Sequence, residues 1–102
     1  MLPSLARLTS PVGYEYTHDR WDFEKLKALL KVGADPDELR GYDEKTALME
    51  AAEEGDVEAV KLLLSYRANT DIQDKEDRTA LINASENGHA EIVKLLLSYR
   101  AD

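Results

Sequence analysis

The chain has 102 residues, 43% of them hydrophobic, and this length suits one domain with a modest core. It contains no cysteine, which excludes disulfides and thiolate metal sites, and no apolar run close to the roughly 20 residues that a membrane-spanning helix needs. The net charge is −8 and Lys and Arg do not cluster, so we expect neither direct nucleic-acid binding nor membrane binding.

Residues 1–20 are expected to be a leader or a cap on the helices that follow. Leu2, Leu5 and Leu8 recur every third residue, and Pro3 and Pro11 prevent a long helix. The segment lacks the apolar stretch of a signal peptide, so we expect an intracellular, cytoplasmic protein. His18 is a lone histidine, for which a surface or capping role is expected.

The first clear helical pattern follows Trp21. Asp22 is a natural N-cap, Gly33 a left-handed C-cap, and Pro36 prevents continuation of the helix. Apolar residues recur here at helical spacing: Phe23, Leu26, Leu29, Leu30 and Val32. We read Trp21 and Phe23 as core or cap residues rather than as a ligand box.

Two further helix pairs are predicted. Thr46 caps a short helix over residues 47–53, Gly55 breaks it, and Asp56 caps a helix over residues 57–65. In the same way Thr79 caps residues 80–86, Gly88 follows, and a last helix covers residues 90–98. The loops before Thr46 and Thr79 are rich in charge and read as turns.

The two pairs are copies of one unit. Residues 43–69 and 76–102 are identical at 16 of 27 positions when the sequence is shifted by 33 residues. Each predicted helix has only two to three turns, too short to persist alone in water. Its apolar face must therefore be covered by the neighbouring pair, as in a solenoid of stacked repeats.

The repeated motif resembles that of the ankyrin repeat family. It runs from Thr-Ala-Leu through Gly55 or Gly88 to Glu-x-Val-Lys-Leu-Leu-Leu and Ala68 or Ala101. The resemblance covers residues 21–102 and implies an all-α solenoid of stacked helix–turn–helix units with β-turn fingers. It implies a half-repeat over residues 21–41 and full repeats over 42–74 and 75–102.

This chain departs from the family pattern at several positions. Arg67 and Arg100 stand where the family has a glycine after the second helix, so either a strained left-handed cap or a cap of another geometry is expected there. Glu44 and Asp77 replace the turn glycine of the fingers, although Gly41 can take over the first turn. The family's Pro-Leu-His becomes Ala-Leu-Met and Ala-Leu-Ile, which predicts looser fingers.

The last helix pair has no predicted successor to cover its outer side. We expect an exposed C-terminal face that includes parts of Ile82, Ile92 and Leu96. Such a face is expected to drive self-association or to contact a partner.

No catalytic constellation is found, so we expect no enzyme, no cofactor and no metal site. The sequence has no phosphate-binding loop, no His-x-x-x-His and no nucleophile elbow. His89 occupies the position of the capping Asp56, which favours a structural role. Asn69, Asp71 and Asp74 are too sparse for a calcium loop, which needs a closing bidentate Glu.

The resemblance implies that a protein partner docks on the finger tips and on the concave face of the first helices. Tyr42 is the most informative candidate, because exposed aromatic residues at loop tips often anchor interfaces. The full candidate set is Tyr42, Asp43, Lys45, Glu53, Glu54, Lys75, Glu76, Arg78, Glu86 and Asn87. Their alternative role is that of solvated loop residues.

The leading hypothesis is a non-enzymatic protein–protein interaction module. A second hypothesis is an acidic inhibitor or nucleic-acid mimic that occupies a basic groove of its partner. A third is an engineered or truncated scaffold, which is suggested by the verbatim copies of Leu-Leu-Leu-Ser-Tyr-Arg-Ala.

Overall fold

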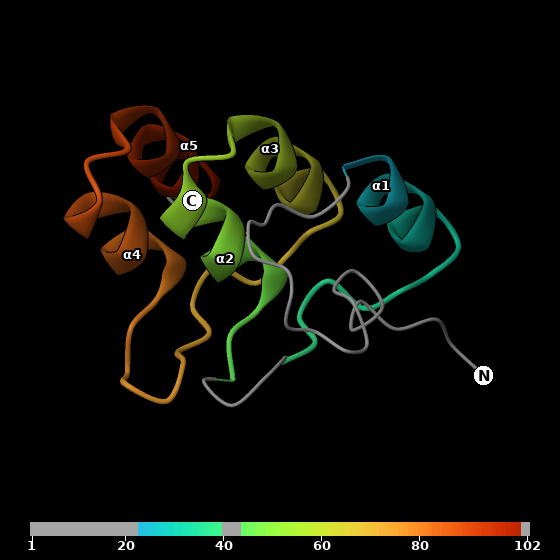
Figure 1. Cartoon of the computed structure of the whole chain (residues 1–102), viewed down its shortest axis with the longest axis horizontal. Helices are drawn as coiled ribbons and strands as arrows, with labels where there is room; N and C mark the ends of the chain where they lie inside the picture. The colour runs from blue at the N-terminus through green and yellow to red at the C-terminus, as the bar shows by residue number, and fades with distance from the viewer. Residues whose placement is uncertain (1–22, 40–43, 101–102) are drawn as a thin grey trace, which may run out of the picture. The chain divides into compact units, whose positions relative to one another are not determined.

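The computed structural model describes residues 23–39 and 44–100, which form five α-helices and no strand (Figure 1). The chain divides into two compact units, Met1–Asp35 and Pro36–Asp102. The first contains α1, and the second contains the other four helices. The helices are α1 (Phe23–Lys31), α2 (Ala47–Glu54), α3 (Val57–Ser65), α4 (Ala80–Glu86) and α5 (Ala90–Arg100).

Helix α1 forms where the spacing of apolar residues predicts it. Leu26 and Leu30 are buried, whereas Val32 is 66% exposed. Val32 lies just beyond the last helical residue, where the chain already turns. Gly33 has a φ of 103°, as expected for a left-handed cap, and the amide of Ala34 donates to the carbonyl of Leu29 at 3.0 Å. Residues 1–20, Trp21 and Asp22 lie outside the described residues.

Helices α2 and α3 begin at the predicted caps. The Oγ1 atom of Thr46 accepts from the amide of Met49 at 3.2 Å, and Asp56 Oδ1 accepts from the amide of Ala59 at 3.1 Å. Each side chain satisfies an amide that has no partner inside its helix. Gly55 joins the two helices with a φ of 77°, a conformation in which a side chain would be strained.

Helices α4 and α5 repeat this plan with small differences. Thr79 Oγ1 accepts from the amide of Ile82 at 3.3 Å, and Gly88 joins the helices with a φ of 73°. Helix α5 continues to Arg100, so the predicted end at residue 98 was two residues short. Arg100 is therefore helical, whereas Arg67 has a φ of 65° and is the left-handed cap of α3.

The two helix pairs stack in two layers. Helix α2 packs against α4 in one layer and α3 packs against α5 in the other (Figure 1). Alanines on the first helices permit this close approach, and Ala51, Ala52 and Ala84 are fully buried. The larger side chains that these four helices bury are Leu48, Met49, Val60, Leu63, Ile92 and Leu96. Burial of this set is the main force that holds these short helices together.

The C-terminal face differs from the expectation. Ile92 and Leu96 are fully buried, so placing them on the exposed outer side was wrong. They lie on the stripe of α5 that faces the preceding helices. The next residues along the helix, Val93 and Leu97, point about 100° further round, and Leu97 is 48% exposed. Ile82 is 39% exposed, as expected.

Candidate functional site

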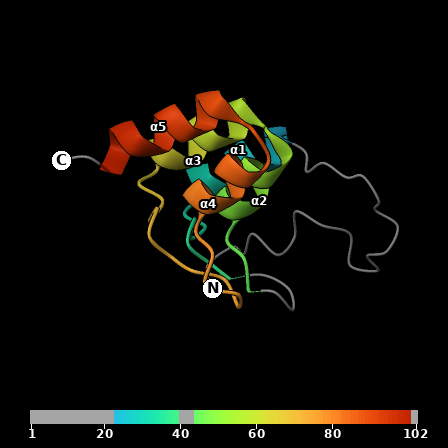
Figure 2. The same ribbon diagram turned by 90° about the vertical axis from the view of Figure 1, so that its left-hand side faces the viewer.

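The loop between α3 and α4 forms a finger that projects beyond the α2–α4 layer (Figures 1 and 2). Its tip is closed by Asp74, whose Oδ1 accepts from the amides of Glu76 and Arg78 at 2.8 and 3.0 Å. The amide of Asp77 donates to the carbonyl of Asp74 at 2.9 Å. Asp77 has a φ of 63°, which confirms that it takes the place of a turn glycine. Asp74 is buried, and its two hydrogen bonds shape the finger.

Arg78 connects the base of this finger to α4. Its guanidinium forms an ion pair with Glu86, and its Nε lies 3.4 Å from Oδ1 of Asn83. The Oε1 atom of Glu76 lies 3.9 Å from a second guanidinium nitrogen. The Arg78 side chain is one-third exposed. Its guanidinium group therefore contacts α4 and is also open to solvent in part.

The preceding repeat has the same connection. Lys45 Nζ lies 2.7 Å from Oε2 of Glu53, and these residues stand 33 positions before Arg78 and Glu86. The Lys45 and Glu53 side chains are 20% and 34% exposed. Glu44, just before Lys45, has a φ of 54° and so matches Asp77 in the second finger. Each described finger base is thus tied to its own first helix by an oppositely charged pair.

The structure brings together five of the ten predicted site residues, as these two pairs and Glu76 beside Arg78. Lys75 and Glu76 lie at the exposed tip of the second finger, and Glu54 and Asn87 lie at the ends of α2 and α4. Asn87 donates from Nδ2 to the carbonyl of Asn83 at 2.8 Å and so partly caps its own helix. Tyr42 and Asp43 lie outside the described residues, as does Gly41.

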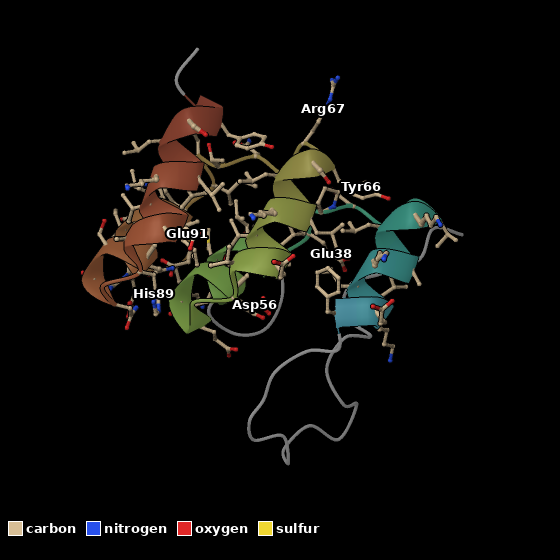
Figure 3. The ribbon with its side chains drawn as sticks, turned by 90° about the horizontal axis from the view of Figure 1, so that it is seen from above. Glu38, Asp56, Tyr66, Arg67, His89 and Glu91 are labelled. Atoms are coloured by element: carbon tan, nitrogen blue, oxygen red, sulfur yellow. The ribbon has the colours of Figure 1, made fainter. Side chains whose placement is uncertain are left out.

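His89 has a role that the sequence did not specify. Its ring Nε2 lies 3.0 Å from the carbonyl oxygen of Glu53, at the C-terminal end of α2 in the previous repeat (Figure 3). A Cβ atom added to Gly55 would lie 2.7 Å from Cε1 of this ring. The His89 ring therefore packs directly over Gly55, where the side chain of any other residue would collide with it. A structural role was predicted, but a sequence offers no sign of which carbonyl an imidazole will meet.

Asn83 is the second residue whose role the sequence did not specify. It is 1% exposed, and its Nδ2 has no hydrogen-bond partner among the described residues. The equivalent position in the first full repeat is Glu50, which is partly exposed. Because Asn83 receives the Arg78 side chain, the hydrogen bond at its Oδ1 helps to fix the base of the finger.

Two tyrosines and an open hollow lie at the far end of the second helices. Tyr66 and Tyr99 are 37% and 55% exposed. Tyr99 borders a pocket of about 930 Å³ that is otherwise lined by the end of α3 and the loop after it, including Arg67 and Thr70. Tyr99 thus faces the end of the neighbouring repeat across this hollow. Figure 3 shows Arg67 pointing away from the helices.

Neither a metal centre nor a membrane span is found in residues 23–39 and 44–100. No three His, Cys, Asp or Glu side chains of this part of the chain gather closely enough to hold a metal ion. None of its helices combines the length and apolar character that crossing a membrane requires.

Comparison with protein families supplies the context for this geometry. Residues 19–102 match the model of a family described as ankyrin repeats (3 copies). Comparison with curated proteins gives no match. Ankyrin repeats are generally protein–protein interaction modules, and their family is typically non-enzymatic. The all-α fold, the helix–turn–helix units and the fingers agree with this match, which spans most of the sequence. The chain belongs to the ankyrin repeat family.

Proposed function

We propose that the chain binds a protein partner through its finger tips and the exposed side of α2 and α4. The proposal rests mainly on the repeated pairs Lys45–Glu53 and Arg78–Glu86, which hold charged groups at the same place in successive repeats. A partner that docks along the stack would meet a regular row of donors and acceptors. Because each cation is already positioned by a carboxylate, less side-chain entropy is lost on binding.

The chemistry of this surface favours a partner with cationic or donor groups. Helix α2 carries three glutamates, at positions 50, 53 and 54, whereas the equivalent positions of α4 are Asn83, Glu86 and Asn87. Glu76 and Glu86 are 75% and 53% exposed at the side chain. Acidic groups at the rim of an interface raise the association rate with a basic partner.

A binding experiment tests this assignment. Protein captured from native cells by the full chain would be compared with that captured by the double variant Tyr42→Ala plus Arg78→Ala. Arg67→Ala is the matched control, because this arginine is exposed at the opposite end of the finger loop. We expect the partner to be lost with the double variant and retained with the control. A partner that survives the double variant would remove the assignment to this face.

The second candidate function is that of an acidic inhibitor or nucleic-acid mimic in a basic groove. It is supported by the net charge of −8. This function predicts an affinity that falls steeply as salt is added, because the contacts are mainly between exposed charges. A complex that is insensitive to salt would reject it. In both cases the protein would act inside the cell and without catalysis.

A further inference from the structure

The turn between α4 and α5 contains the dipeptide Asn87–Gly88, and both residues are exposed. In an Asn-Gly sequence the backbone nitrogen of the glycine can attack the side-chain amide carbon of the asparagine. Glycine permits this approach because it has no Cβ atom to hinder it. The equivalent turn between α2 and α3 has Glu54 before its glycine and so lacks a reactive amide.

The folded turn holds the two reacting groups apart. Asn87 has a ψ of 6°, which places the Gly88 nitrogen nearly eclipsed with the backbone nitrogen of Asn87 instead of beside its Cβ atom. Ring closure needs the nitrogen beside Cβ, so the backbone must rotate about this ψ angle. The Nδ2 atom of Asn87 also donates to the carbonyl of Asn83 at 2.8 Å, which draws the side-chain amide back along α4.

Backbone hydrogen bonds of the same turn oppose this rotation. The amide of Gly88 donates to the carbonyl of Ser85 at 3.2 Å, and the amide of His89 donates to the carbonyl of Ala84 at 3.0 Å. Rotation at Asn87 displaces both donors, so these bonds must break before the Gly88 nitrogen reaches the side chain. The reaction therefore requires local opening of the turn, and its observed rate follows the open fraction.

We propose that Asn87 is a site of spontaneous deamidation that is controlled by opening of the α4–α5 turn. In the open turn the Gly88 nitrogen loses its proton to solvent base and forms a bond to Cγ of Asn87. The bond from Cγ to Nδ2 breaks, and Nδ2 takes up a proton and leaves as ammonia. Water then opens the resulting succinimide ring at either carbonyl, which gives aspartate or isoaspartate. The only co-reactant is water.

The product cannot restore the turn. A carboxylate accepts hydrogen bonds but does not donate them, so the bond to the Asn83 carbonyl is lost. The new negative charge lies beside Glu86 at the C-terminal end of α4, where the helix dipole disfavours it. In isoaspartate the main chain also runs through Cβ and Cγ, which shifts Gly88 and His89 away from their acceptors. Deamidation therefore favours the open turn, and this inference does not depend on the proposed binding function.

Peptide mapping by mass spectrometry tests the site in the full chain. The protein is incubated in mildly alkaline buffer with and without denaturing urea, and conversion of amide to acid is followed at the three asparagines, Asn69, Asn83 and Asn87. We expect conversion at Asn87 in both conditions, at least about tenfold faster in urea. Asn69 and Asn83 should react far more slowly, because each precedes a residue with a Cβ atom. Equal rates at Asn87 in the two conditions would exclude control by the turn, and no conversion in urea would exclude the site.

The substitution His89→Ala tests the control by opening. The His89 ring ties the start of α5 to the carbonyl of Glu53, and its removal should open the turn more often without changing the reacting groups. We expect deamidation of Asn87 to become about threefold or more faster in the folded protein and to stay unchanged in urea. Lys94→Ala is the matched control, because Lys94 is exposed on the same helix. An unchanged rate in folded His89→Ala would overturn the proposal.

The effect of the product is tested with Asn87→Asp, for which Asn87→Gln is the control that keeps a donor. Amide hydrogen exchange at Gly88 and His89 should be about threefold or more faster in Asn87→Asp than in Asn87→Gln. Equal exchange in the two variants would contradict the claim that deamidation favours the open turn.

Discussion

The two full repeats have nearly the same sequence, but they have different surroundings. Leu64 and Leu97 occupy equivalent places on α3 and α5, yet one is 3% exposed and the other 48%. Gly55 and Gly88 have similar φ values, yet only Gly55 has an imidazole against it. The difference shows that the exposure of a residue here is set by whether a described helix pair covers it, and only secondarily by its type.

The largest expected effect is the contrast between Leu64→Ala and Leu97→Ala. Removing a buried leucine side chain leaves a cavity and costs about 2–5 kcal/mol, whereas a half-exposed leucine should cost below about 1 kcal/mol. Urea unfolding followed by circular dichroism measures both. Similar losses of stability for the two variants would show that Leu97 is covered in solution.

Gly55→Ala and Gly88→Ala form the next pair. Both place a side chain in the left-handed region, at about 1 kcal/mol. At Gly55 the new methyl group would also collide with the His89 ring, which adds about 1–3 kcal/mol. The losses of unfolding free energy in the two variants should therefore differ only by the cost of this collision. Adding His89→Ala to Gly55→Ala should remove the difference, and its persistence would exclude the ring as the cause.

Replacing the arginine near the end of the second helix with glycine should change stability in opposite directions in the two repeats. Arg67→Gly relieves a non-glycine residue at a φ of 65° and should raise stability by a few tenths to about 1 kcal/mol. Arg100→Gly places glycine in a helical position and should lower stability by up to about 1 kcal/mol. Thermal unfolding of the two single variants is sufficient. Stabilisation by Arg100→Gly would mean that α5 ends earlier than described.

The smallest effects are expected for the ion pairs. Lys45→Met and Arg78→Met should each change the unfolding free energy by less than about 1 kcal/mol, because the pairs are partly exposed and solvent screens them. Arg78→Met should cost more than Lys45→Met, since Arg78 also reaches Asn83 and Glu76. Repeating the measurement in concentrated salt should shrink both effects. A cost that is large and independent of salt would mean that these side chains act through packing.

Much of the fold could be predicted because its signals are local. Thr46, Asp56 and Thr79 are caps whose side chains meet amides three residues ahead, and a sequence displays that spacing directly. The positive φ values of Arg67 and Asp77 could be expected from the repeat pattern, since both residues stand where the family has a glycine. The match of Lys45 with Arg78 and of Glu53 with Glu86 was also available in the sequence, as a charge pair that recurs after 33 residues.

The parts that could not be predicted depend on contacts between helices. Three consecutive leucines, 95–97, give no indication of which one faces inward, so Leu96 was assigned to the outer side although it is fully buried. The His89 contact joins residues 36 positions apart and depends on the exact approach of α5 to α2. The Nδ2 atom of Asn83, which has no hydrogen-bond partner among residues 23–39 and 44–100, likewise follows from packing, because an exposed asparagine would bond to water.

The central claim is that α4 and α5 shield the apolar face of α2 and α3, whereas no described helix covers the equivalent face of α4 and α5. Because the chain has no cysteine, single-cysteine variants Met49→Cys and Ile82→Cys can report the two equivalent positions separately. The rate of thiol labelling under native conditions should be slow at position 49 and fast at position 82. Comparable rates at the two positions would contradict the account.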